Sequence, residues 1–509
     1  MRSRLRAFVL AAAAAGAAVT VAAAALGSDE AGFKELEIRY KKAAKNRDDA
    51  GNRDRRRILL EAFAYRDLKP CRKLLRDAYG DEVLSDLRIF VVQSLAATGD
   101  PKDVDFLLTA FKKERMAGPQ IALGRGLGYT DVAQAATMSA YLAGLVTKQK
   151  GEPLRSILEG IGTLADPAAY PGLAALPAFG EKNDKLTKPE QFERLIALGS
   201  CGREKACAAL ATAATASDAD FRLAAALGLG QTGGPDQPPA ADSLPTLTAL
   251  VADSDPRVVE AAANALAATK HEAAVKPLIE ALRTQTFRTR EAVRAALQAI
   301  TGRDAGHDAD AWEKAGGTAP PPKIPTVEGL PFASDRVALI LDLSRSMAWN
   351  GRIGRAQGVL ADAIHALPDD AYFGVVAAGR TPVVQSDKLA TGGSAKIAAE
   401  EWFRKQLTAG GCDLREALNY VLRTWPSVDT IVLATDSAPF GESAEDTSFD
   451  VIEEFRRDAR IRRVRVFVAF TCPGGRVEAS ETDADEYADR KEILKQFAEG
   501  SGGKFKAIE

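Results

Sequence analysis

Residues 337–346 read VALILDLSRS, an apolar run that opens into a polar loop. Five consecutive apolar residues predict a strand buried on both faces, as in a parallel sheet covered by helices. Asp342, Ser344 and Ser346 follow at every second position, so a carboxylate and two hydroxyls share one short loop. Oxygen ligands of this kind suit a hard cation such as Mg²⁺ or Mn²⁺.

Further short apolar runs follow and alternate with helical patterns. They span residues 373–377, 430–434 and 464–470, and residues 502–508 predict a final edge strand. Residues 353–367 carry apolar side chains at intervals of three and four, which predicts a helix with one apolar stripe. This alternation indicates a doubly wound, mainly parallel α/β sheet, whose working site lies beyond the carboxyl ends of the strands.

Two later motifs belong to the same edge of this sheet. Residues 410–414, Gly-Gly-Cys-Asp-Leu, open a helix, and residues 433–436, Leu-Ala-Thr-Asp, close a strand. Together with the first loop, and in this order, they resemble the von Willebrand factor type A domain and its metal-ion-dependent adhesion site. The resemblance covers residues 335–509 and implies a Rossmann-like doubly wound fold.

The resemblance also implies a set of metal ligands. Ser344 and Ser346 correspond to the hydroxyls that bind the cation directly, and Asp342 and Asp436 to the carboxylates that act directly or through water. Cys412 stands where the family has a threonine ligand. Because a neutral thiol is a poor ligand for a hard cation, the chain departs from the family pattern at this position.

Two interpretations of this site remain open. In the first, two carboxylates neutralise a bound Mg²⁺ or Mn²⁺ and leave one coordination position for an acidic side chain of a protein partner. In the second, the loop is a vestigial family signature, and Asp342 and Asp436 bond to nearby backbone and hydroxyl groups without a metal. Trp349 and Arg352, in the loop that follows, could frame a partner surface.

The first half of the chain is rich in Ala and Leu and predicts an all-α solenoid over residues 28–315. Three similar helical stretches, at residues 221–228, 255–266 and 290–297, include a period of 33 residues between Arg257 and Arg290. They resemble HEAT repeats, with an irregular helical bundle as the alternative.

The end of the repeat region and its junction also follow from the sequence. A last repeat helix that stops at Gly302, with Trp312 folded back over it, would close the array. The proline-rich residues 316–334 form the predicted linker to the second domain. The combination resembles exported bacterial proteins that join HEAT repeats to a von Willebrand factor type A domain.

The amino terminus has the layout of a secretory signal. Three arginines precede an apolar, Ala-rich run, and residues 1–27 predict a signal peptide with the mature chain starting near Ser28. The protein is then expected in the periplasm or at the cell surface. In the alternative, the N-terminal segment is not cleaved and anchors the protein in the membrane. The chain has five cysteines, an odd number, and we expect no disulfide framework.

Composition separates the candidate functions. With 67 basic and 69 acidic residues the net charge is −2, and 23 of the basic and 28 of the acidic residues lie from Asp335 onward. A Ro-like RNA-binding protein, which the combination of repeats and type A domain also resembles, needs a basic footprint, so no nucleic-acid partner is expected. Three histidines and no phosphate-binding glycine loop argue against an enzyme. The sequence predicts an exported protein–protein interaction scaffold.

Overall fold

The computed structural model describes residues 30–181, 184–314, 326–327, 329–331, 334–408, 411–437, 448–471 and 481–508. The chain divides into two compact units, Met1–Pro321 and Pro322–Glu509, and this division falls inside the range 316–334 that the sequence assigns to a linker. The predicted signal, residues 1–27, lies outside the described residues. No helix within the described ranges combines the length and the apolar character needed to span a bilayer.

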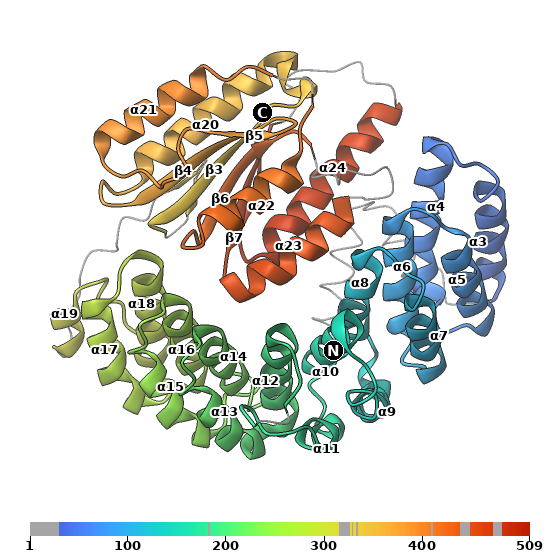
Figure 1. The fold of residues 1–509 in the computed structure, drawn as a ribbon, viewed down its shortest axis with the longest axis horizontal. Helices are drawn as coiled ribbons and strands as arrows, with labels where there is room; N and C mark the ends of the chain where they lie inside the picture. Colours follow the sequence, from blue (N-terminus) through green and yellow to red (C-terminus); the bar gives the residue numbers. More distant parts are fainter. Residues whose placement is uncertain are drawn as a thin grey trace. The chain divides into compact units, whose positions relative to one another are not determined.

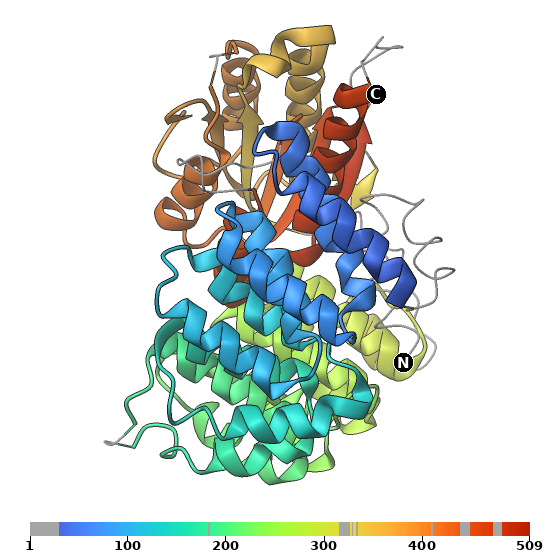
Figure 2. The same cartoon turned by 90° about the vertical axis from the view of Figure 1, so that its right-hand side faces the viewer.

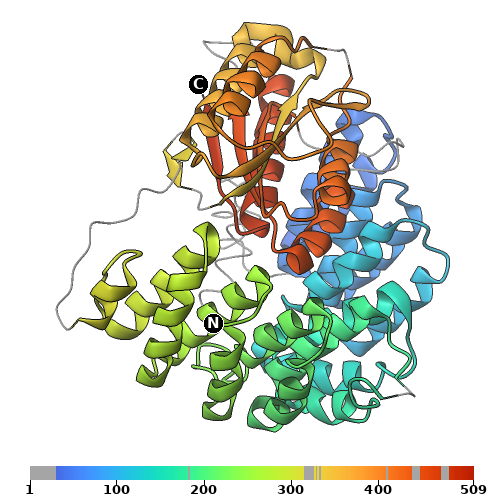
Figure 3. The ribbon, with the colours of Figure 1, turned by 60° about the vertical axis from the view of Figure 1, so that its left-hand side comes forward.

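The first unit is a stack of helix pairs, coloured blue to yellow-green in Figure 1. One row of helices stacks directly from pair to pair: α4 (Asp49–Ala62), α6 (Ser85–Ala96), α8 (Ala117–Leu127), α10 (Gly151–Leu164), α12 (Lys188–Gly202), α14 (Ala219–Leu229), α16 (Pro256–Thr269) and α18 (Phe287–Thr301). The second row comprises their partners: α3 (Glu30–Ala43), α5 (Lys69–Asp81), α7 (Pro101–Phe111), α9 (Val132–Ala143), α11 (Tyr170–Ala174), α13 (Cys207–Ala213), α15 (Leu244–Leu250) and α17 (Val275–Thr284). Short 3-10 turns lie between helices: η1 (Phe63–Tyr65), η2 (Pro167–Ala169), η3 (Arg203–Ala206), η4 (Ala241–Ser243) and η5 (Glu272–Ala274). Figures 2 and 3 show the successive pairs from two further sides, and the predicted all-α solenoid is confirmed.

The end of the stack matches the sequence pattern. Gly302 follows α18 in the left-handed conformation, with φ +74°, and so ends that helix. Trp312 in α19 (Ala309–Glu313) is buried, and its indole Nε1 donates to the carbonyl of Gly306 at 2.9 Å. The last helix pair is therefore closed by a short helix of the same chain.

Aspartate caps start many of these helices. Asp100, Asp131, Asp218 and Asp255 each precede a helix in extended conformation and accept a hydrogen bond from the backbone N–H two residues later. A cap of this kind stabilises a helix by about 1 kcal/mol, because the first amide groups have no partner inside the helix. The repeated aspartates are thus the local signal that divides this Ala-rich sequence into short helices.

Small residues allow the stacked helices to approach closely. A Cβ atom added at Gly199 of α12 would lie only 2.0 Å from the backbone oxygen of Gly228 in α14. Since any side chain at Gly199 would meet backbone rather than a flexible side chain, the distance between these two helices depends on glycine at this position.

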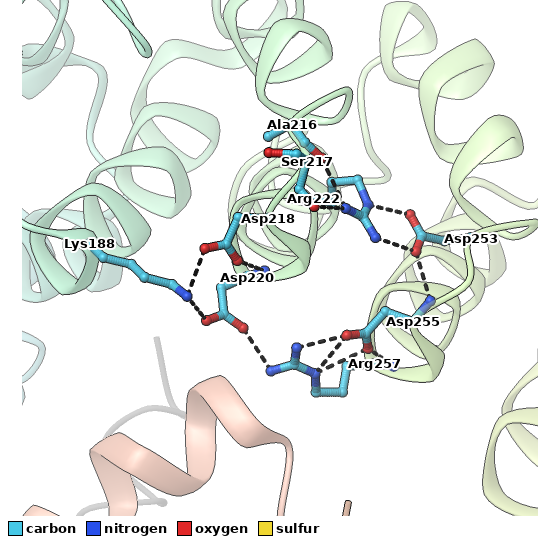
Figure 4. A network of polar contacts seen from close by, with 9 residues as sticks. All are labelled: Lys188, Ala216, Ser217, Asp218, Asp220, Arg222, Asp253, Asp255 and Arg257. Atoms are coloured by element: carbon cyan, nitrogen blue, oxygen red, sulfur yellow. Dashed lines mark hydrogen bonds and ion pairs between the residues drawn. The ribbon is translucent and has the colours of Figure 1, made fainter. Parts of the chain in front are cut away.

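A chain of ion pairs links the first turns of three stacked helices, as Figure 4 shows. Lys188 of α12 lies 2.8 Å from Asp218 and 2.5 Å from Asp220 at the start of α14. Arg257 of α16 bridges back to Asp220 at 2.8 Å and also contacts Asp255, its own helix cap. These ion pairs link successive repeats at the first turns of their helices.

Arg222 and Asp253 form a second link beside this chain (Figure 4). Arg222 donates through Nε at 2.6 Å and through Nη2 at 2.9 Å to the two oxygens of Asp253, and its Nη1 donates to the carbonyls of Ala216 and Ser217. Burial acts to raise the pKa of Asp253, but the hydrogen bonds from Arg222 and from the backbone of Asp255 outweigh it, so that the pKa lies below its usual value.

The second unit contains a six-stranded sheet with the order β5-β4-β3-β6-β7-β8. Its strands are β3 (Arg336–Asp342), β4 (Tyr372–Ala378), β5 (Pro382–Val384), β6 (Thr430–Thr435), β7 (Arg465–Thr471) and β8 (Phe505–Ile508). All neighbouring strands are parallel except β4 and β5. The predicted doubly wound, mainly parallel sheet is confirmed, and each predicted strand occurs within two or three residues of its expected start.

Helices cover both faces of this sheet, as Figure 1 shows in yellow to red. On one face α20 (Arg352–Ala366) and α21 (Gly393–Arg404) pack against alternate residues of β3 such as Leu339. On the other face α22 (Leu414–Thr424), α23 (Ser448–Arg462) and α24 (Glu481–Gly500) pack against the residues between them, such as Ile340. Both faces of β3 are buried, which explains its uninterrupted apolar sequence.

Three short strands were missing from the sequence prediction. The edge strand β5 has three residues and begins at Pro382, so it carries no alternating pattern long enough to detect. A two-residue pair of strands, β1 (Thr326–Val327) with β2 (Leu330–Pro331), lies inside the predicted linker range, and β1 packs beside α20 of the second unit.

We predict that Gly199→Ala destabilises the repeat unit by about 1 to 3 kcal/mol, because the new methyl group overlaps the backbone of Gly228 and forces α12 and α14 apart. The free energy of unfolding, measured by urea titration of the full chain, tests this. Gly358→Ala is the matched control, because a Cβ at this position in α20 would have nothing within 4 Å. Equal stability of the Gly199 variant and the wild type would contradict the close approach.

The pair of Arg222 with Asp253 predicts acid sensitivity. A carboxylate whose pKa is depressed in the folded state stabilises the fold above its unfolded pKa of about 3.9, and this contribution is lost as the pH falls through the folded pKa. Between pH 5 and pH 2 the wild type should therefore lose more stability than Asp253→Asn, measured by urea unfolding at successive pH values. Asp77→Asn, in an exposed pair with Lys73, serves as control. Parallel curves for the wild type and the Asp253 variant would refute the assignment.

Candidate functional site

The strand register brings the predicted site residues to one edge of the sheet. β3 ends at Asp342, and β6, its neighbour, ends at Thr435, with Asp436 next in the chain. Leu341 is paired with Ala434, so the two carboxylates follow neighbouring positions at the carboxyl ends of parallel strands. The turn η6 (Arg345–Gly351) then leads from the first strand into α20.

Asp342 is completely buried and its carboxylate is held by donors from three segments. Oδ1 accepts from the backbone N–H of Ser344 at 2.6 Å, and Oδ2 accepts from the hydroxyl of Thr435 at 2.6 Å. The thiol of Cys412 provides a third hydrogen bond. Burial raises the pKa of Asp342 above its usual value, and these three hydrogen bonds act in the opposite direction.

Asp436 is also buried, and hydroxyl groups surround its Oδ1 atom. Ser346 donates to it at 2.8 Å, Ser437 at 3.0 Å and Ser344 at 3.3 Å. The Oγ atoms of Ser344 and Ser346 are themselves 3.1 Å apart. The two hydroxyls that the sequence assigned to a cation therefore point at a carboxylate of the same site.

The second oxygen of Asp436 is paired with an arginine. Arg352, the first residue of α20, places Nη1 2.5 Å from Oδ2 of Asp436 and 3.4 Å from the carbonyl of Ser346. Arg352 is only 8% exposed, so this is a buried ion pair in which both charges are shielded from water.

Cys412 lies beside Asp342, directly before the helix that residues 410–414 were predicted to open. Asp413 caps this helix, α22, by accepting from the N–H of Glu416 at 2.8 Å, and its own N–H donates to Gly379 after β4. Burial, with the neighbouring Asp342 carboxylate, raises the pKa of the Cys412 thiol. The group is therefore a neutral thiol, which suits its role as a hydrogen-bond donor.

The structure thus brings together all five predicted site residues, Asp342, Ser344, Ser346, Cys412 and Asp436. Sequence reasoning placed Arg352 on a partner surface and did not include Thr435. One signal for Arg352 was available: it stands four residues before Ala356, on the apolar stripe of the helix, and a charged group on a buried stripe needs a buried partner.

The residues present fit a divalent cation poorly. Each of the four carboxylate oxygens of Asp342 and Asp436 already accepts a hydrogen bond from the protein. Among the described residues, no group of three or more His, Cys, Asp or Glu side chains is arranged to hold a metal ion. Binding of Mg²⁺ or Mn²⁺ stays a prediction of the sequence, and these contacts favour its metal-independent alternative.

The fold and site define a class, a helical-repeat protein joined to a doubly wound α/β domain. Within the first unit, residues 237–298 match the protein family described as HEAT repeats. No curated protein matches the chain.

Solved structures show likeness to each half. A von Willebrand factor type A protein from Catenulispora acidiphila is 22% identical with a TM-score of 0.26, over 35% of this chain and 40% of that one. The archaeal HEAT-like repeats protein from Thermococcus onnurineus NA1 is 13% identical with a TM-score of 0.30, and the match covers 45% of this chain and 97% of that one. Human deoxyhypusine hydroxylase is 18% identical with a TM-score of 0.21, and the match covers 53% of this chain and 97% of that one. These TM-scores are low, so the description of the architecture rests on the helices and strands of this chain and not on these three structures.

We predict that Asp436→Ala lowers the free energy of unfolding by about 3 to 5 kcal/mol, because it leaves the buried guanidinium of Arg352 without its counter-charge. Chemical denaturation of the full chain measures the change. Arg404→Gln is the control: it removes one charge of an exposed pair with Glu400 on α21 and should leave stability unchanged within error. A loss for Asp436→Ala no larger than that of the control would show that the pair does not stabilise the fold.

Proposed function

We propose that the protein is an exported interaction scaffold that binds a protein partner at the carboxyl edge of the second unit's sheet. The observation that carries this proposal is the exposed indole of Trp349, which is 58% accessible in the turn η6 between Ser346 and Arg352. Tryptophan is enriched among the residues that dominate binding energy in protein interfaces.

Charge at this edge supports an acidic partner. Arg345 follows β3 and Arg380 follows β4, and both are exposed. The neighbouring acids Asp342 and Asp436 are buried and bonded within the site, so they offer little negative charge to the outside. An Asp or Glu of a partner would then meet arginine side chains, whose planar guanidinium groups suit a carboxylate.

A cation-mediated contact with the same acidic side chain is the other route that the sequence predicts. The hydrogen-bonded carboxylates and the pair of Arg352 with Asp436 support the route through arginine. The two routes differ in one measurable respect, since only the cation-mediated contact depends on free divalent metal.

A binding role is favoured over catalysis by the positions of the histidines. His271 caps η5, His307 bonds to Glu291 at 3.0 Å and His365 bonds to Glu400 at 2.7 Å. Within the second unit, His365 does not hydrogen-bond to Ser344 or Ser346, so no histidine of that unit is placed to activate these hydroxyls.

The arguments about nucleic-acid binding and about export come from the amino-acid sequence. The excess of acidic residues from Asp335 onward supports a protein partner over a Ro-like RNA partner. The leader-like residues 1–27 and the mature start near Ser28 support a place in the periplasm or at the cell surface, with an uncleaved anchor as the alternative.

The test is affinity capture from an extracytoplasmic extract with three baits: the full chain, Trp349→Ala and Leu407→Ala. Leu407 is 80% exposed on the same unit and serves as the matched apolar control. We expect Trp349→Ala to reduce recovery of the bound protein at least about tenfold, since tryptophan hot spots contribute 2 kcal/mol or more, while Leu407→Ala retains it.

Further arms of the same capture experiment separate contact through arginine, contact through a divalent ion and binding of RNA. Addition of EDTA leaves recovery unchanged if the contact uses arginine, and abolishes it if a divalent ion mediates the contact. Recovery that nuclease removes would favour the RNA-binding alternative. Equal recovery by all three baits would exclude Trp349 from the interface. The intact mass of the full chain, expressed in the organism that naturally produces it, reports whether residues 1–27 are removed.

A further inference from the structure

We infer that Arg352 supplies, from within the chain, the positive charge that the loop of Asp342, Ser344 and Ser346 together with Asp436 would otherwise take from a divalent cation. This inference concerns how the edge is assembled and does not depend on whether a partner binds there.

The first support is the position of the guanidinium. Nη1 of Arg352 lies 2.5 Å from Oδ2 of Asp436, whose Oδ1 accepts from Ser346, and 3.4 Å from the carbonyl of Ser346. The arginine therefore contacts the same carboxylate and the same loop that would hold an ion. Its side chain is 10% exposed, so the contact is internal and is shielded from salt and water.

The second support is the chemistry of Cys412. At a site that needs a hard oxygen ligand, replacement of threonine by cysteine removes that ligand. At a site without a metal no oxygen ligand is needed at this position, and the thiol of Cys412 donates a hydrogen bond to Asp342. The loss of the oxygen ligand at Cys412 and the buried guanidinium of Arg352 beside Asp436 therefore have one explanation.

The third support is the balance of charge. A divalent ion neutralises two carboxylates, whereas one guanidinium neutralises only one. Asp436 has the guanidinium, and Asp342 instead has three donors, from Ser344, Thr435 and Cys412. Buried carboxylates that are paired or fully hydrogen-bonded need no further cation.

The inference is tested with the full chain by calorimetric titration with MnCl₂. The wild type should bind no Mn²⁺ at this site. The double variant Arg352→Met with Cys412→Thr removes the internal charge, keeps the bulk of the side chain and restores the oxygen ligand, so it should bind one Mn²⁺ per chain. At about a hundredfold excess of Mn²⁺ over the Kd, the thermal midpoint of the second unit should rise by about 5 to 10 °C.

Two controls fix the location. Arg355→Met with Cys412→Thr alters the next arginine on α20, which donates to the carbonyl of Asn350, and should gain no binding. Addition of Asp436→Asn to the first double variant should abolish the Mn²⁺ response. If Arg352→Met does not fold, Arg352→Gln, which retains a donor for the Ser346 carbonyl, carries the same test.

Binding of one Mn²⁺ by the wild type that Asp436→Asn abolishes would show that a metal displaces the arginine. Failure of every folded Arg352 variant to bind Mn²⁺ would show that the arginine does not stand in for a cation.

Discussion

Two carboxylates end buried strands of a sheet that is covered on both faces, and this burial constrains everything around them. Asp342 and Asp436 are 0% and 1% exposed, so each must find its partners inside the protein. The strand register brings them together, and the loop after β3, the end of β6 and the segment before α22 then supply amide, hydroxyl and thiol donors. Arg352 reaches the site only because α20 begins directly after the turn η6. The path of the chain at this edge follows from the need to satisfy these two acids.

The sequence predicted most of the fold because burial leaves a strong pattern. β3 and β7 are uninterrupted apolar runs since both of their faces are covered, and the stripe of α20 appears because only one side of that helix meets the sheet. β5 escaped detection because three residues starting with proline carry no periodicity. In the repeat region the predicted stretch 255–266 contains the Asp-Pro start of α16, whereas the earlier repeats lacked a regular period.

The site was predictable in its members but not in its contacts. Motif spacing placed Ser344, Ser346 and Asp436 at one sheet edge, because parallel strands end together. Which group a hydroxyl faces depends on side-chain geometry across ninety residues of chain, and the sequence does not encode this locally. Arg352 shows the difference: its place on the apolar stripe of α20 indicated a buried partner, but only the folded arrangement identifies that partner as Asp436.

A positive charge that belongs to the chain, such as the guanidinium of Arg352, gives this edge of the sheet different binding properties from a bound metal ion. A metal ion exchanges with solvent, so a contact that uses it responds to ion concentration, and its open coordination position attracts an outside carboxylate. A guanidinium tethered to α20 does not leave, and Asp436 already neutralises it. If Arg352 takes the place of the cation, as inferred above, the edge is assembled without metal, and attraction for a partner comes from exposed groups around it, such as Trp349 and Arg345. Because arginine side chains on the surface are screened by salt, recognition through them should be weaker in energy but independent of metal supply.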